Sequence, residues 1–168
     1  MKRVAFITVI MLLFFMWMMF SPIVVDMSSG EVGLERTHSG EKYNPFEKIE
    51  INDGIRVYVQ ISRDDYTVIY NKKIIMSRII YTDDMRLLSQ LKECSDFLVS
   101  GGDMATCTSK IYITKNNKTI FKSSIGFEKN NLGLQSQSVG WSQAIYPDKI
   151  KHILLQFDVV TSPLVILF

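Results

Sequence analysis

The sequence contains little of what most catalytic and cofactor-binding sites are built from. Among its 168 residues there are two histidines and two cysteines. Glycines are not spaced as in loops that bind phosphates or dinucleotides, and no calcium-binding loop is present. His, Cys and carboxylate residues do not cluster at the spacing of a zinc site. We therefore expect no cofactor and no metal.

The chain also lacks a strong net charge. It carries 19 basic and 17 acidic residues, for a formal net charge of +2. This balance excludes a disordered charged tail and argues against a nucleic-acid partner. The neutrality is a cancellation, because residues 26–65 hold nine acids and five bases whereas residues 110–129 hold five lysines and one glutamate.

One long apolar run stands at the start of the chain. Residues 4–25 are interrupted only by Thr8, Ser21 and Pro22, and a helix of that length would be roughly 33 Å long, enough to cross a bilayer. Lys2 and Arg3 precede the run, which places the N-terminus in the cytoplasm. The pattern predicts a transmembrane signal-anchor over residues 1–25.

This anchor predicts a single-pass protein of the bacterial inner membrane, with the C-terminal domain in the periplasm. The alternative is a cleaved signal peptide and a secreted domain. No pair of small residues suited to cleavage stands around Ser21 or Val25, and this favours the anchor.

The two cysteines, Cys94 and Cys107, are separated by 12 residues. In an exported protein an even number of cysteines favours a disulfide, which would stabilise the fold by about 3 kcal/mol in the chain-entropy model. The other interpretation is a pair of buried thiols. Neither cysteine belongs to a redox-type C-x-x-C unit.

Residues 26–48 are predicted to be a linker, because Ser, Gly and an Asn-Pro pair break any periodicity there. Residues 49–168 are predicted to form one exported α+β domain. In it, an antiparallel sheet of five or six strands is covered on one face by two amphipathic helices.

The strand pattern is clearest at Ile55–Ile61, where apolar and polar residues alternate. Tyr66–Tyr70 and Ile74–Tyr81 are predicted to follow as strands. A hairpin is expected around Lys115–Lys118, and a further strand over Leu132–Trp141, although Gly133 and Gly140 weaken it.

The first helix is predicted to begin near Thr82 and to end at Gly101-Gly102. Its apolar stripe comprises Leu87, Leu88, Leu91, Cys94 and Leu98. The second helix begins at Pro147 and buries Ile150, Ile153, Leu154 and Phe157. The apolar end of the chain, residues 159–168, is either a buried strand or a surface patch for a partner or a membrane.

Several residues have types that occur in active sites. Ser39 and Ser89 each precede a lysine by three residues, His152 stands on a predicted helix, and acidic pairs occur at 64–65 and 83–84. The simpler interpretation is structural, since turns and helix starts favour Asp. A hydrolase using Ser89, His152, Asp64 and Asp83 is therefore the last of our hypotheses.

Lysines at four positions of the predicted hairpin suggest a basic edge; they are Lys110, Lys115, Lys118 and Lys122. Such an edge fits an acidic partner or lipid headgroups. The alternative is protection of an edge strand against aggregation.

No stretch of the sequence resembles a known family closely enough to name it. The location and the lack of catalytic groups favour a non-enzymatic, membrane-anchored periplasmic binding protein with a protein partner. An immunity or inhibitor protein against an envelope-acting toxin or hydrolase fits this description. The alternative is a bitopic structural subunit of an envelope or secretion assembly.

Overall fold

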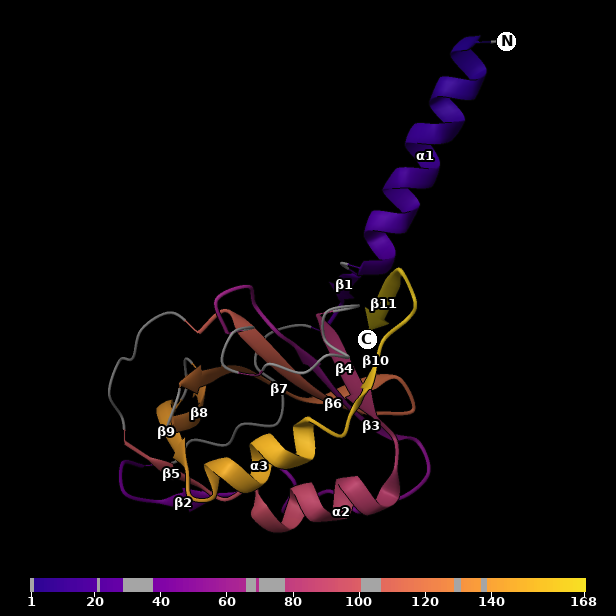
Figure 1. Ribbon diagram of the computed structural model, residues 1–168. Helices are drawn as coiled ribbons and strands as arrows, with labels where there is room; N and C mark the ends of the chain where they lie inside the picture. Colours follow the sequence, from indigo (N-terminus) through magenta and orange to yellow (C-terminus); the bar gives the residue numbers. More distant parts are fainter. Residues whose placement is uncertain are drawn as a thin grey trace.

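The computed structural model describes residues 2–20, 22–28, 38–65, 69, 78–100, 107–128, 131–136 and 139–168. These residues form three helices and eleven strands (Figure 1). The helices are α1 (Lys2–Phe20), α2 (Met85–Cys94) and α3 (Pro147–Leu154). The strands are β1 (Ile23–Asp26), β2 (Lys42–Tyr43), β3 (Ile55–Gln60), β4 (Ile79–Thr82), β5 (Phe97–Val99), β6 (Ser109–Lys115), β7 (Lys118–Glu128), β8 (Asn131–Ser136), β9 (Gly140–Ala144), β10 (Asp158–Val159) and β11 (Leu164–Leu167).

Nine strands form one antiparallel sheet, in the order β10-β4-β3-β6-β7-β8-β9-β5-β2. The α+β class and the antiparallel pairing are confirmed, but the predicted five or six strands are too few. The strands near the two ends of the sheet explain the difference, because β2, β5 and β10 have only two or three residues each. Strands this short do not reveal a period of two in the sequence.

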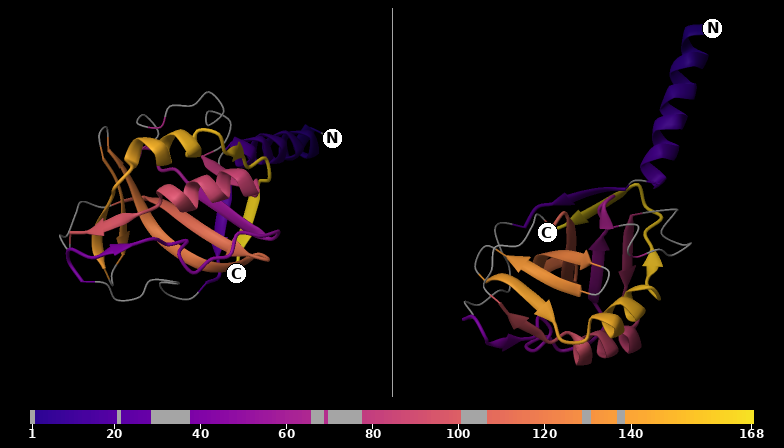
Figure 2. Two further views of the ribbon diagram at one scale, coloured as in Figure 1. Left: turned by 90° about the horizontal axis from the view of Figure 1, so that it is seen from below. Right: turned by 60° about the vertical axis from the view of Figure 1, so that its left-hand side comes forward.

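Helices α2 and α3 cover one face of the sheet and lie side by side (Figure 2). Helix α2 begins after Asp84, whose carboxylate accepts a hydrogen bond of 2.8 Å from the amide of Arg86. Its buried residues are Leu87, Leu88, Leu91 and Cys94, and those of α3 are Ile150, Ile153 and Leu154. Both predicted helices are confirmed, and their apolar stripes make the main core with the alternating residues of β3.

The predicted end of the first helix is wrong. The helix stops at Cys94, and the chain then forms β5, which pairs with β9. Leu98, predicted to lie in the helical stripe, is exposed on β5 between buried Phe97 and Val99. A short apolar segment such as Phe97–Val99 fits both the spacing of a helix and the alternation of a strand. Here the segment is a strand because it pairs with β9.

The single strand predicted over residues 132–141 is wrong, because this segment contributes to two strands, β8 and β9. Gly140 has a φ of 75° at the start of β9, a conformation that glycine adopts without strain. Gly133 lies within β8, beneath the Trp141 ring, where an added Cβ would also stand 2.6 Å from the carbonyl oxygen of Ser142. Gly133 is thus required because Trp141 and Ser142 of the neighbouring strand β9 leave no room for a side chain.

The predicted hairpin is confirmed. Strands β6 and β7 are joined by Asn116 and Asn117, which both have positive φ, at 51° and 66°. Two consecutive residues of this kind match the twist of a two-residue hairpin turn, and asparagine tolerates the conformation. Of the predicted strand Tyr66–Tyr70, the structure describes only Ile69, which is not part of a strand. Of the predicted strand Ile74–Tyr81, residues 74–77 lie outside the described residues, and its last three residues belong to β4.

A second, two-stranded sheet lies on the other face of the main sheet. Strand β1 pairs with β11 in parallel, so the start and the end of the folded domain lie side by side (Figure 1). We call this pair the ribbon. Its Val165 and Leu167 are buried against Tyr112 and Ile79 of the main sheet. The apolar end of the chain therefore forms a strand that is buried on one side only, at Val165 and Leu167.

The predicted transmembrane segment over residues 4–25 is not one helix. Helix α1 ends at Phe20, because Ile23–Asp26 pairs with β11 and Pro22 stands before that strand. The side chains described in α1 are those of residues 4–18. Over the described residues, no helix combines the length and the apolar character needed to cross a membrane.

The predicted linker, residues 26–48, belongs in part to the domain. Lys42–Tyr43 is strand β2, paired with β5, and Phe46 is one of the most deeply buried side chains. The folded domain thus begins before residue 49. Residues 29–37 lie outside the described residues.

Candidate functional site

The lysines of the predicted basic edge do not act as one group. Lys115 and Lys118 face each other beside the hairpin turn and are exposed. Lys110 is exposed five residues away along β6, at roughly 3.4 Å per residue. Lys122 instead forms an ion pair of 2.5 Å with Asp26 of the ribbon. The prediction of an edge is wrong, because β6 and β7 lie in the middle of the sheet. Two adjacent lysines, Lys115 and Lys118, remain together at the hairpin turn.

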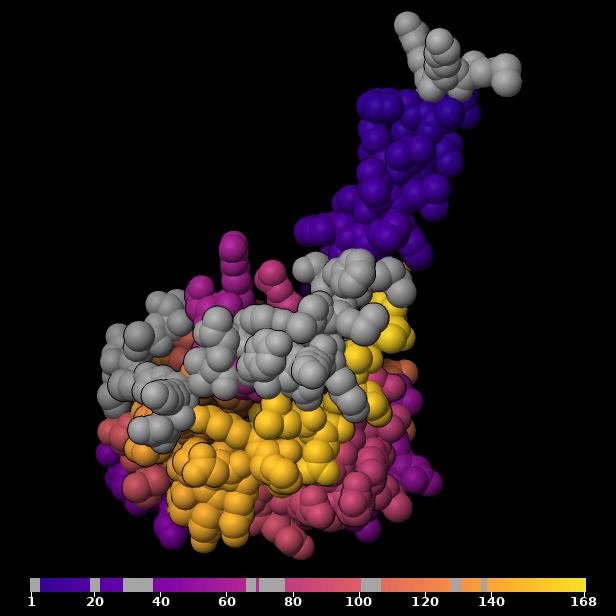
Figure 3. Space-filling model, in the orientation of Figure 1, coloured from indigo at the N-terminus to yellow at the C-terminus, as the bar shows by residue number. Residues whose placement is uncertain are grey.

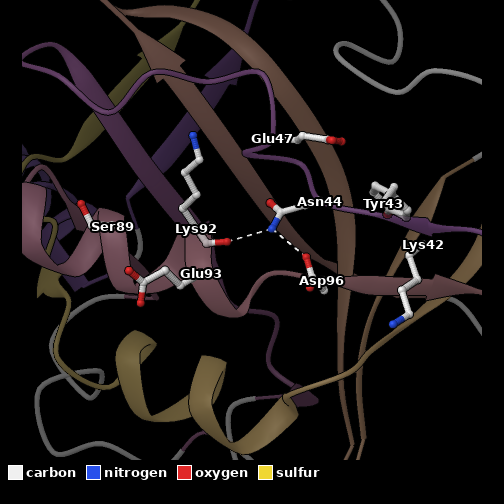
Figure 4. A pocket seen from close by; sticks show the side chains of 8 residues that line it. All are labelled: Lys42, Tyr43, Asn44, Glu47, Ser89, Lys92, Glu93 and Asp96. Atoms are coloured by element: carbon white, nitrogen blue, oxygen red, sulfur yellow. Dashed lines mark hydrogen bonds between the residues drawn. The ribbon is translucent and has the colours of Figure 1, made fainter.

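A groove of about 620 Å³ lies between the β2 segment and helix α2 (Figure 4). It is lined by Lys42, Tyr43, Asn44, Glu47, Ser89, Lys92, Glu93 and Asp96. Two of these side chains are basic and three are acidic, so the groove presents both signs of charge.

Asn44 fixes one wall of the groove against the other. Its side-chain Nδ2 donates to the carbonyl oxygen of Lys92 at 2.8 Å and to Oδ1 of Asp96 at 2.9 Å. Its Oδ1 accepts from the amide of Phe46 at 2.9 Å. The amide group therefore joins the segment after β2 to the end of α2 and orients buried Phe46.

A second bond holds the same two segments together. The Lys92 ammonium donates to the carbonyl oxygen of Ile49 at 2.6 Å. Its tip points away from the other groove lysine, Lys42 (Figure 4). Hydrogen bonds from both Asn44 and Lys92 thus link the two walls of the groove. The charged groups diverge instead of meeting at one point (Figure 4).

Tyr43 provides the aromatic part of the groove. Its ring stacks on Phe97 with 5.8 Å between ring centroids. Burial raises the pKa of Tyr43 to about 12, so its hydroxyl stays protonated at neutral pH.

The residues considered for catalysis have structural partners. Ser89 donates to the carbonyl oxygen of Met85 at 2.7 Å, within α2. Asp83 pairs with Arg56 at 3.4 Å, and Asp65 accepts from the hydroxyl of Ser109 at 2.5 Å. Asp84 caps α2, as the turn interpretation predicted.

The proposed hydrolase residues also lie on separate elements. His152 is exposed on α3, Ser89 lies on α2, and Asp64 lies in the turn after β3. Across the part of the chain that the structure describes, no three His, Cys, Asp or Glu residues are grouped to hold a metal ion.

The predicted disulfide is not formed. Cys94, the last residue of α2, is buried in the core, and its thiol donates to the carbonyl oxygen of Leu91 at 3.6 Å. The Cys107 sulfur lies beside Gly126, whose position on β7 alternates with that of core residue Ile125. The two cysteines therefore occupy opposite faces of the sheet. The short distance between Cys94 and Cys107 in the sequence did not indicate that they lie on different faces.

Sequence reasoning missed the groove because its first half fell in the predicted linker. A signal was present in Asn44-Pro45-Phe46, since Asn before Pro favours a turn and a following aromatic residue favours burial. Strand β2 has only two residues, and no period identifies it.

Comparison of the chain with protein-family models, with curated proteins and with solved structures finds no match.

Proposed function

We propose that this is a non-enzymatic binding protein that works at the exported face of a bacterial membrane and recognises a protein partner through the groove beside α2. An immunity or inhibitor protein that neutralises an envelope-acting toxin or hydrolase is the form of this function that we favour. The observation that carries the proposal is a groove whose walls are joined by hydrogen bonds and which is lined by charges of both signs.

The chemistry of the groove supports a protein partner over a small molecule. Small-molecule pockets are mostly apolar with a few convergent polar groups, whereas the charged tips here diverge (Figure 4). Interfaces between proteins use complementary charges to select partners and to speed association. Lys42, Glu47 and Glu93 line the groove and are suited to such contacts.

The proposed location rests on α1. Its described side chains are apolar except for Thr8, whose hydroxyl donates to the carbonyl oxygen of Val4 at 2.9 Å. A helix that is apolar on every side is stable where lipid or protein surrounds it. The basic residues before the helix favour export of the domain that comes after it. Without a disulfide, the cysteines lend no support to this location.

Charge reversal in the groove tests the function. The chain with Glu47→Lys and Glu93→Lys should fail to retain the envelope protein that the unaltered chain retains. The matched control changes the same charges outside the groove, as Glu50→Lys and Asp158→Lys; both of these residues are exposed. Equal retention by both variants would contradict recognition through the groove.

The activity of the retained partner then shows whether this protein is an inhibitor or another kind of binding protein. A toxin or hydrolase that is purified with the chain should lose activity when the chain is added in equimolar amount. Full activity under these conditions would exclude the inhibitor function.

The second candidate, a structural subunit of an envelope assembly, is favoured by the exposure of α1 on all sides, since other helices can cover it. Replacing residues 4–20 by an unrelated apolar helix distinguishes the two functions. An inhibitor should tolerate the exchange, whereas a subunit that packs through α1 should not. Residues 23–26 must be kept, because they form β1.

A further inference from the structure

The outer side of the ribbon is an exposed apolar surface. Six side chains contribute to it, with exposed fractions between 40% and 63%: Ile23, Val25, Met27, Leu164, Ile166 and Phe168. The register places Ile23 beside Leu164 and Val25 beside Ile166. We call these six residues the ribbon face.

The ribbon is apolar on both sides. Val165 and Leu167 point toward the main sheet and are buried there, and the residues that alternate with them point outward. Strands that are apolar on both sides are typically covered on both sides. The main sheet covers the inner side of the ribbon, and among the described residues nothing packs over the outer one.

The ribbon face continues the apolar surface of α1. Only Ser21 and Pro22 separate the helix from β1 in the sequence. The ribbon lies at the end of the domain from which α1 leaves (Figures 1 and 2), and Figure 3 shows α1 standing clear of the domain. From Val4 to Trp17 every residue of α1 is exposed. Whatever surrounds α1 is therefore within reach of the ribbon face.

We propose that the ribbon face lies against the bilayer in which α1 is embedded, so that the domain rests on the lipid surface in one orientation. This inference rests on the membrane location proposed above. The lipid is favoured over a protein partner by size. Six half-exposed side chains offer roughly a few hundred Å², below the about 800 Å² per partner of a stable protein complex.

Charge next to the ribbon face agrees with lipid. The backbone of Phe168 bonds to Asn117 and Thr119, which places the tip of the β6–β7 hairpin beside the patch. The exposed lysines of that tip, Lys115 and Lys118, are thus held near the proposed surface. Basic side chains in this position attract anionic headgroups. The lipid-headgroup interpretation of the basic edge therefore applies to these two lysines.

Tryptophan fluorescence in lipid vesicles tests the contact on the full chain. The vesicles contain phosphatidylcholine and phosphatidylglycerol, with or without bromine near the ester end of the acyl chains, because bromine quenches tryptophan on contact. The reporter variant carries Trp17→Phe and Ile166→Trp. The control carries Trp17→Phe and Leu98→Trp, since Leu98 is exposed to 42% and Ile166 to 44%, and Leu98 lies on β5. Trp141 is buried and gives the same background in both.

We expect brominated vesicles to quench the reporter at 166 and to leave the control at 98 unchanged. A second reporter, Val25→Trp in the same background, should behave like the first, and it guards against a fold defect at 166. Equal emission in both kinds of vesicle at positions 25 and 166, with Trp17 of the unaltered chain quenched, would overturn the ribbon contact alone. An unquenched Trp17 would refute the membrane location, and the ribbon contact with it.

Discussion

Lys122 of β7 and Asp26 of β1 form an ion pair of 2.5 Å between Nζ and Oδ2, with 24% and 16% of their side chains exposed. The Asp26 carboxylate also accepts hydrogen bonds from the amide and the hydroxyl of Ser28. The pair joins the first strand of the ribbon to the middle of the main sheet. It explains why one lysine of the predicted basic edge is not available to a partner.

This ion pair should contribute to stability. Replacing Lys122 by Met, or Asp26 by Asn, is expected to lower the free energy of unfolding by about 1–2 kcal/mol, since the partner then loses a charge-assisted hydrogen bond. Urea unfolding of both single variants and of the double variant checks this. The double variant should lose less than the sum of the singles, and additive losses would contradict direct coupling.

The effect of Asp26 should depend on pH in one direction. Burial alone would raise the pKa of Asp26, but the bonds from Lys122 and Ser28 outweigh it and hold this pKa below its usual value. Its contribution is therefore complete above the carboxyl pKa of the unfolded chain, near 4, and is lost as the pH falls through the lower pKa of the folded state. The difference in unfolding free energy between the unaltered chain and Asp26→Asn should be constant from about pH 5 to 7 and shrink below about pH 4. A difference that grows toward low pH would contradict this sign.

Asn44 should matter more for stability than the exposed charged residues of the groove. Asn44→Ala removes three hydrogen bonds, to Lys92, Asp96 and Phe46, at about 1 kcal/mol each, so we expect a loss of about 2–3 kcal/mol. Urea unfolding measures it. The control is Lys42→Ala, an exposed groove residue, which should change the stability by less than about 0.5 kcal/mol. Equal effects of the two variants would mean that Asn44 does not hold the groove walls together.

The cysteines should behave as two thiols. Alkylation in denaturant without reductant is expected to label both Cys94 and Cys107, as counted by mass spectrometry. In the folded protein Cys94 should react far more slowly, because burial raises the pKa of this thiol to about 11 and the thiolate is the reactive form. No labelling before reduction would show that a disulfide exists after all.

Much of the fold could be predicted where one segment carries its own pattern. The alternation at Ile55–Ile61 and the stripe over Leu87–Cys94 each identify an element, because six or more residues repeat at one period. The starts of α2 and α3 could also be predicted, because the Asp84 cap and Pro147 each stabilise the first turn of their helix. The groove was not predictable, because Asn44 and Lys92 meet from elements 48 positions apart.

By itself, the sequence determined the α+β class, the two packed helices, the hairpin at Asn116-Asn117 and the apolar character of the first helix. These features depend on contacts between near neighbours, which a local pattern records. Only the tertiary structure decided that β1 pairs with β11, that Lys122 turns to Asp26, and that the cysteines lie on opposite faces of the sheet. Each of these depends on which strand lies beside which. The pairing of distant strands is set by the packing of the whole chain and leaves no periodic mark on any one segment.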